Sequence, residues 1–106
     1  MAGYFIAPYN VIDPETYAQY NPGSMGTIMQ TLERHGGRVL AAGKGEQAEW
    51  VSGSPTHVYV VLEFPTTQAA HAWHDDPDYA AAKAIRLRAT DNITTMILPE
   101  FVMPTG

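Results

Sequence analysis

The sequence predicts an α+β domain in which an antiparallel sheet carries its helices on one face. The strongest strand signal is the stretch His57–Phe64, which combines three Val with Tyr and Phe. A Gly-Ser-Pro turn at 53–55 precedes this stretch and Pro65 ends it. Two Asp-Pro pairs, at 13–14 and 76–77, are typical helix starts, and further strand-like runs lie between the helical ones.

The first strand and the first helix start are predicted close together. Residues 3–11 carry Tyr, Phe, Ile and Val, which favour β structure, whereas Pro8 cannot donate to a ladder and indicates an edge or a bulge. Asp13 then caps a helix whose first residue is Pro14. The run Asn21-Pro22-Gly23-Ser24-Met25-Gly26 interrupts this helix.

The helix is expected to resume over about 27–34, with Ile28, Met29 and Leu32 inward. His35-Gly36-Gly37 ends it, because glycine past a helix C-terminus supplies the left-handed conformation. The second strand is predicted over 38–42, with a short continuation over 47–51.

After the strand at 57–64, Thr66 or Thr67 caps a helix to about His74 with Ala69, Ala70 and Trp73 as apolar positions. A further helix over 77–89 places Ala80, Ala84 and Leu87 against the sheet. The last strand is expected over about 93–98. The order β-α-β-β-α-β is the ferredoxin-like arrangement.

The two faces of the strand at 57–64 differ in character. Val58, Val60, Leu62 and Phe64 form one apolar face that suits helix packing, because side chains alternate across a strand. The other face carries His57, Tyr59, Val61 and Glu63. Polar groups on a central strand need partners, so this face either meets a second subunit or lines a pocket. A two-fold homodimer through the sheet faces is the simpler expectation.

Composition excludes several classes of protein. The 106 residues predict one domain, 1–106, and the content is 45% hydrophobic with a net charge of −5. Six Lys and Arg do not predict a nucleic-acid interface, and no apolar run is long enough for a membrane span. The absence of cysteine removes disulfides and thiolate chemistry. We therefore expect a cytoplasmic protein without nucleic-acid or membrane partners.

The run from Val60 to Thr90, VVLEFPTTQAAHAWHDDPDYAAAKAIRLRAT, resembles the small bacterial DUF1330 family of dimeric α+β barrel proteins. Asp13-Pro14-Glu15-Thr16-Tyr17, Tyr20 and His35-Gly36-Gly37-Arg38 resemble the same family. The resemblance implies a ferredoxin-like protomer that pairs sheet to sheet. The wider superfamily includes cofactor-free monooxygenases, isomerases, haem-dependent peroxidases and non-catalytic dimers, so the fold does not decide the function. The insert at 22–26 departs from the family pattern.

Three residues are candidates for catalysis. His57 and Glu63 are proton-transfer candidates, although six residues of strand, about 20 Å, keep them apart within one subunit. A salt bridge at the dimer interface is their structural alternative. Arg86 could hold a substrate carboxylate or an enolate, or could tie its helix to the sheet through Glu63 or a backbone carbonyl.

The candidate substrate-binding residues are the aromatic side chains Tyr20, Trp73 and Tyr79, which can form either pocket walls or core. His35 is expected to cap its helix. His71 and His74 have ligand spacing on a helix, but no third ligand is visible, so no metal and no cofactor are expected.

Two functions of different class follow. The first is a cofactor-independent enzyme of isomerase, cyclase or monooxygenase type acting on a small apolar or aromatic metabolite. The second is a non-catalytic homodimer with a structural or ligand-binding role. An open pocket with an unpaired Arg86 favours the first, and an Arg86 engaged by Glu63 favours the second.

Overall fold

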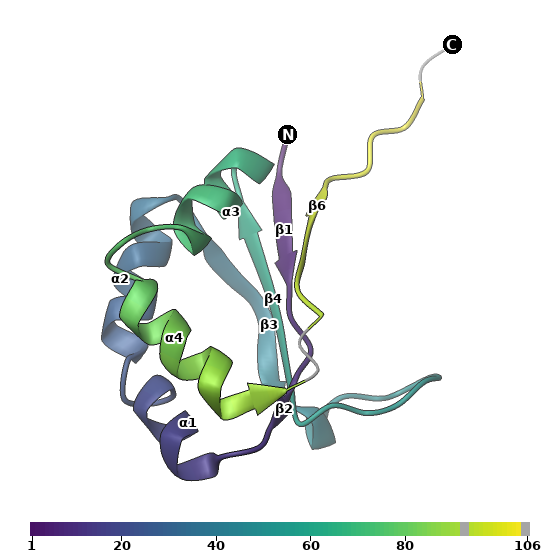
Figure 1. The fold of residues 1–106 in the computed structure, drawn as a ribbon. Helices are drawn as coiled ribbons and strands as arrows, with labels where there is room; N and C mark the ends of the chain where they lie inside the picture. The colour runs from purple at the N-terminus through teal and green to yellow at the C-terminus, as the bar shows by residue number, and fades with distance from the viewer. Residues whose placement is uncertain (92–93, 105–106) are drawn as a thin grey trace.

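The computed structural model describes residues 1–91 and 94–104, and in this part of the chain one face of a four-stranded sheet is covered by helices (Figure 1). The antiparallel strands have the order β3-β4-β1-β6. Their bounds are β1 Gly3–Ile6, β3 Arg38–Lys44, β4 Val58–Phe64 and β6 Met96–Pro99. This order is the ferredoxin-like one, so the predicted fold class is confirmed.

The central pair of strands is β1 and β4, with Gly3 opposite Phe64 and Ile6 opposite Val61. A short second ladder joins β2 (Asn10–Val11) to β5 (Thr90–Asp91). The described part of the last strand begins at Met96, and the expected start at Ile93 lies outside the described residues.

The first two helices are α1 (Pro14–Tyr20) and α2 (Met25–Arg34). Asp13 caps α1 as predicted, since its carboxylate accepts hydrogen bonds from the backbone N and the hydroxyl of Thr16. The predicted interruption is a turn over 21–24, and Gly36, with φ of 73°, follows α2 as expected.

One inward position of α2 was predicted wrongly. Ile28 and Leu32 are buried, but Met29 is 45% exposed, and Thr31 takes the third inward place. The reason is the helical repeat, because positions 28, 31 and 32 share one stripe and position 29 lies beside it.

The remaining helices are α3 (Thr67–His74), which Thr66 caps, and α4 (Ala80–Ala89). The predicted start of α4 at Pro77 is wrong. The Asp76 carboxylate accepts from the backbone N of Asp78, and the N–H of Tyr79 donates to the carbonyl of Asp76. Residues 77–79 therefore form a turn, and the helix begins at Ala80.

The inward stripe of α4 also differs from the prediction. Ala80, Ala84 and Leu87 are exposed, whereas the buried positions are Ala82, Arg86 and Ala89, together with Tyr79 just before the helix. Tyr79 sets this face, because its ring stacks on Trp73 with the centroids 4.4 Å apart. Arg86, two turns later, consequently points inward.

Trp73 lies at the centre of the core, as predicted, with 2% of its surface exposed. Its ring meets Phe5 edge-on at a centroid distance of 5.3 Å and packs against Phe64 at 5.7 Å. The indole Nε1 donates to the Thr31 hydroxyl at 3.1 Å, so its one polar group has a buried partner.

The strand expected over 47–51 is absent from the described structure. A short 3₁₀ helix, η1 (Gly45–Gln47), ends β3, and residues 48–57 form an arm that leaves the sheet on the side away from the helices (Figure 1). At its base a Cβ on Gly45 would collide with the carbonyl of Thr56. The chain entering the arm at Gly45 and the chain leaving it at Thr56 are in direct contact there, and β3 ends at this point.

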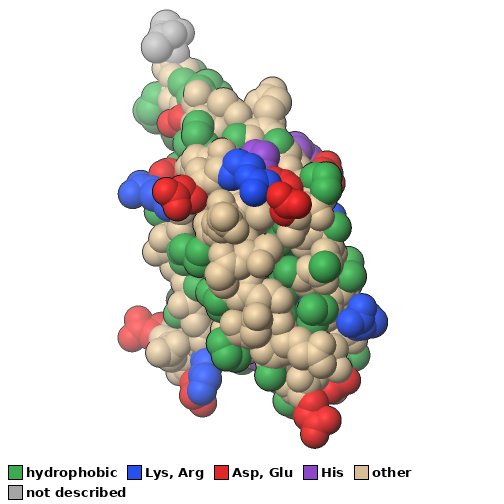
Figure 2. Space-filling view, turned by 90° about the vertical axis from the view of Figure 1, so that its left-hand side faces the viewer, with side chains coloured by type: hydrophobic (Ala, Val, Ile, Leu, Met, Phe, Trp, Pro, Cys, Tyr) green, Lys and Arg blue, Asp and Glu red, His purple; other side chains and the backbone are tan. Residues whose placement is uncertain are grey.

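The two sides of the sheet present different surfaces. Figure 2 shows the helix-covered side, where apolar and charged side chains are interspersed and basic groups lie beside acidic ones. The uncovered face carries mainly partly exposed apolar side chains, among them Ile6, Val61, Met96 and Leu98. None of the described helices is long and apolar enough to cross a membrane.

Candidate small-molecule site

A cavity of about 780 Å³ lies between the sheet and the helices. Its floor is the inner face of β1 and β4, including Phe5, Val58 and Val60. Met29 of α2 and Val39 of β3, which are 45% and 42% exposed, lie where the cavity reaches the surface. The volume falls within the range of roughly 300–1,000 Å³ typical of ligand pockets.

Arg86 is the buried charged group of this cavity, whereas Lys44 and Glu46 line its exposed part. Arg86 lines the wall with only 3% of its surface exposed, and its Nε has no hydrogen-bond partner among the described residues. The contact of Nη2 is to His74 Nε2, at 3.4 Å. Glu63, the partner considered from sequence, instead accepts from Arg38 at 2.7 Å.

His74 is uncharged at neutral pH. Burial lowers its pKa to about 4, and the positive charges of Lys83 and Arg86 act in the same direction. The imidazole therefore contributes no counter-charge or competing positive charge next to the guanidinium. The helical spacing of His71 and His74 indicates only a metal ligand, so the place of His74 beside Arg86 is not apparent from the sequence.

Two pairs of tyrosine hydroxyls lie around the cavity. Tyr9 and Tyr17 are joined by a hydrogen bond of 2.6 Å, and Tyr20 and Tyr79 by one of 2.9 Å. Burial raises the pKa of Tyr9, of Tyr20 and of Tyr79, while the charge of Arg86 opposes each rise and so indicates that it is near. These phenols stay protonated at neutral pH.

The aromatic candidates from sequence come together here. Tyr20 and Trp73 line the cavity, and Tyr79 stands behind them, stacked on Trp73 and bonded to Tyr20. Tyr9 was missed. Phe5, Ala7 and Tyr9 lie at alternate positions and are all buried, a pattern that indicates an inward-facing Tyr9. Pro8 obscures this pattern in the sequence, because it suggests that the strand is broken there.

The two proton-transfer candidates, His57 and Glu63, lie in different places, and of the two only His57 lines the cavity. His57 lies at the cavity rim, where its Nδ1 accepts a hydrogen bond from the backbone N of Val11 at 3.0 Å. Glu63 is not among the lining residues, and its pairing with Arg38 lies on the uncovered face of the sheet. The catalytic role of either residue stays a prediction.

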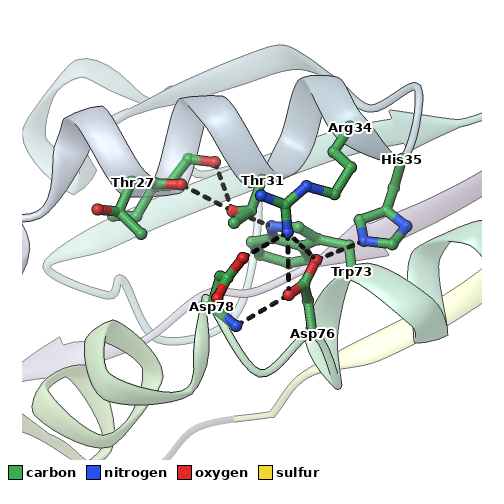
Figure 3. Close-up of polar contacts among 8 residues, drawn as sticks. Thr27, Thr31, Arg34, His35, Trp73, Asp76 and Asp78 are labelled. Carbon is green, nitrogen blue, oxygen red and sulfur yellow. Dashed lines mark hydrogen bonds and ion pairs between the residues drawn. The ribbon is translucent and has the colours of Figure 1, made fainter.

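A separate ion cluster ties α2 to the turn between α3 and α4 (Figure 3). The Asp76 carboxylate meets Arg34 at 3.0 Å and His35 at 2.7 Å, and Arg34 also reaches Asp78 at 2.8 Å. His35 follows α2 at its C-cap, as predicted. The His35 hydrogen bond is the main cause that lowers the pKa of Asp76. Among the described residues, no group of three or more His, Cys, Asp or Glu side chains is arranged to hold a metal ion.

The comparisons with known proteins agree with this fold. The family model described as a domain of unknown function, DUF1330, matches residues 2–101. None of the curated proteins compared with the chain matches it.

Several solved structures share the architecture. A protein of unknown function from Rhodopseudomonas palustris has 20% identity and a TM-score of 0.71, with 96% of this chain and 84% of that one covered. A protein from Nitrosomonas europaea, provisionally named an antibiotic biosynthesis monooxygenase, has 15% identity and a TM-score of 0.69, with 99% and 94% covered. A dimeric ferredoxin-like protein of unknown function from Thermobifida fusca has 17% identity and a TM-score of 0.60, with 94% and 92% covered. At these identities the likeness shows the fold alone.

Proposed function

The chain belongs to the DUF1330 family, and from its fold and its cavity we propose that it binds a small, largely apolar or aromatic metabolite between sheet and helices. The observation that carries the proposal is the cavity of about 780 Å³, in which apolar walls converge on one buried charge. Such a combination is typical of ligand and active sites. A core that served only for stability would be filled at crystal-like density.

We extend the proposal to cofactor-independent catalysis of isomerase, cyclase or monooxygenase type. Arg86 would stabilise an enolate or another anion formed from the substrate, because a preorganised donor in a water-poor site acts strongly on developing charge. Tyr20 and Trp73 would hold the apolar part. His57, at the rim, is the proton-transfer candidate that lines the cavity. The name of the Nitrosomonas europaea protein supports this class of reaction by analogy of fold.

The binding step can be tested with N-phenylnaphthylamine, a neutral apolar dye whose fluorescence rises in an apolar site. We expect saturable binding to the wild type and loss of binding in Ala42→Trp, which places an indole in the cavity mouth. Ala81→Trp, on the exposed side of α4, is the matched control. Equal dye binding by all three proteins would rule out this cavity as the binding site.

The catalytic step can be tested by mass spectrometry of a small-molecule extract incubated with the protein and no added cofactor. Isomerisation leaves the mass of a compound unchanged and oxygenation raises it, so the product distinguishes the reaction types. Arg88→Met, an exposed arginine on the same helix, should retain the conversion, and Arg86→Met should lose it. If no compound changes in an Arg86-dependent manner, the protein is a binding protein.

For both the catalytic and the non-catalytic function, we further propose a homodimer formed through the uncovered sheet face. The partly exposed apolar side chains of that face support it, and the arm at 48–57 extends from the same side (Figure 1). The Thermobifida fusca protein and a second neighbour, from Bacteroides fragilis, are described as dimeric. Closed two-fold pairing would cover the apolar face in each copy.

A further inference from the structure

We infer that the ligand of this cavity carries a single carboxylate and that this group binds the unpartnered Nε–H edge of Arg86. The inference rests on the proposed function, since it names the chemical class of ligand for the same cavity. It follows from the charge, the free donors and the surroundings of Arg86.

The buried guanidinium of Arg86 carries a positive charge that no described carboxylate balances. A guanidinium stays protonated in proteins, and that of Arg86 is 97% removed from solvent, since 3% of the residue is exposed. The ion pairs of residues 1–91 and 94–104 use Arg34, His35 and Arg38, and no carboxylate within these ranges lies within 4 Å of Arg86. A buried charge without a partner strongly destabilises a fold, so an anion entering the cavity restores what the protein lacks.

One edge of the Arg86 guanidinium offers hydrogen-bond donors to a ligand. In the described part of the chain, Arg86 Nε–H has no hydrogen-bond partner, and the adjacent Nη2 has only the long contact to His74. A carboxylate accepts from two neighbouring N–H groups of one guanidinium edge at once, which makes this pairing stronger than a single bond. Nε–H and Nη2 of Arg86 together therefore offer the two neighbouring donors that a bidentate carboxylate requires.

The paired tyrosine hydroxyls add further hydrogen-bond donors near Arg86. When two hydroxyls hydrogen-bond to each other, one proton lies between them and the other proton remains free. Tyr9 with Tyr17 and Tyr20 with Tyr79 thus each retain one O–H donor, and in the described part of the chain neither pair has a further acceptor. Each tyrosine pair near Arg86 consequently has one O–H donor without an acceptor among the described residues. An ionised carboxylate accepts and does not donate, so it complements all of them.

The single positive charge at the buried end of the cavity selects a carboxylate over a phosphate, since Lys44 lines only the exposed part. His74 is neutral beside Arg86, so the buried end of the cavity holds one positive charge. A phosphate monoester carries a charge of about −1.5 to −2 at neutral pH and would leave negative charge buried without a partner. One carboxylate balances the site. The apolar walls then receive the rest of the ligand in the direction of the mouth.

Calorimetric titration with three compounds of one shape tests the inference: phenylbutyrate, its neutral amide phenylbutyramide, and phenylbutyl phosphate. For the wild type we expect phenylbutyrate to bind at least about tenfold more tightly than the amide and the phosphate, in line with a charge-assisted hydrogen-bond pair. Arg86→Met should bind the acid and the amide equally. Arg86→Lys, which keeps the charge without the forked donors, should keep a reduced preference for the acid. Arg88→Met is the matched control and should behave as wild type.

The outcomes separate the two proposals. Equal binding of acid and amide by the wild type overturns the carboxylate assignment and leaves an apolar binding pocket. Tighter binding of the phosphate overturns the charge-balance argument, and an acid preference that persists in Arg86→Met places the anion elsewhere. Failure of all three compounds to bind the wild type overturns the proposed function together with the inference.

Discussion

Arg86 shows how one residue sets stability against ligand binding. Because its charge is buried without a counter-ion among the residues that the structure describes, replacing it by a similar-sized apolar side chain removes a desolvation cost. We expect Arg86→Met to raise the unfolding free energy of the unliganded protein by roughly 1–3 kcal/mol. Urea denaturation measures this change. Arg88→Met, on the exposed side of the same helix, should shift stability by less than about 0.5 kcal/mol.

A loss of stability in Arg86→Met would assign the guanidinium a packing role in place of a binding role. The distinction matters, because both roles place the residue inside the protein, and only the second leaves an unsatisfied charge in the absence of ligand.

Asp76 makes stability depend on pH. Hydrogen bonds from His35, Asp78 and Arg34 lower its pKa below the ordinary value of 3.8, so the folded state binds this proton less readily than the unfolded state. Its contribution is complete above the ordinary pKa and is lost as the pH falls below it. We expect Asp76→Asn to be less stable than wild type at neutral pH, and the difference between the two proteins to shrink below about pH 4.

Urea denaturation of both proteins from about pH 7 to about pH 2.5 measures this difference. Asp75→Asn is the control, because Asp75 is exposed and forms none of the ion pairs of the cluster. A gap between Asp76→Asn and wild type that stayed constant with pH would show that the cluster acts through shape and not through charge.

The arm at 48–57 depends on glycine at its base. A Cβ at Gly45 would collide with the carbonyl of Thr56, beside the 2.8 Å hydrogen bond from the Gly45 N–H to the His57 carbonyl, so the two backbone segments would have to shift. We expect Gly45→Ala to open the base and to speed protease cleavage within 48–57. Gly26→Ala is the control, because nothing lies within 4 Å of its Cβ, and its cleavage should match wild type. Unchanged cleavage in Gly45→Ala would show that the arm is not anchored there.

Elements with strong local signals were predictable from sequence, and elements governed by tertiary contacts were not. The β4 pattern and the cap at Asp13 depend on a few neighbouring residues, and both are confirmed. The start of α4 depends on Asp76, whose partners Arg34 and His35 are distant in the chain. A local rule reads Asp76-Pro77 as a helix start, and the long-range ion pairs override it.

The site was predictable only in its parts. Arg86, Trp73 and Tyr20 were proposed from residue type and helical position, and the structure brings them to one cavity. That the inward face of α4 includes Arg86 could not be predicted, since the packing of Tyr79 on Trp73 fixes the rotation of this helix. The tyrosine pairs join residues 8 and 59 positions apart, a proximity that sequence does not reveal.

For the whole molecule, the uncovered sheet face decides the state of assembly. Val61 lies in the middle of that face, opposite Ile6 of β1 and Ala41 of β3. We expect wild type to run at twice the chain mass of 11.6 kDa in light scattering after size exclusion, and Val61→Asp to run as a monomer, because paired copies would bury unpartnered carboxylates. Leu87→Asp, on the exposed side of α4, should remain dimeric. A wild-type protein of single-chain mass would contradict the dimer.

The position of β1 between β4 and β6 has a consequence for the order of events during synthesis. β1 leaves the ribosome before both strands that flank it, since Gly3 pairs with Phe64 on one side and with Pro99 on the other. The nascent chain therefore holds a strand with open edges until much later segments emerge, and closing such distant contacts slows folding. Ribosome-stalled chains that stop before β6 should accordingly bind a general chaperone, and release it once β6 has emerged. Equal chaperone binding at both lengths would show that the sheet closes by another order.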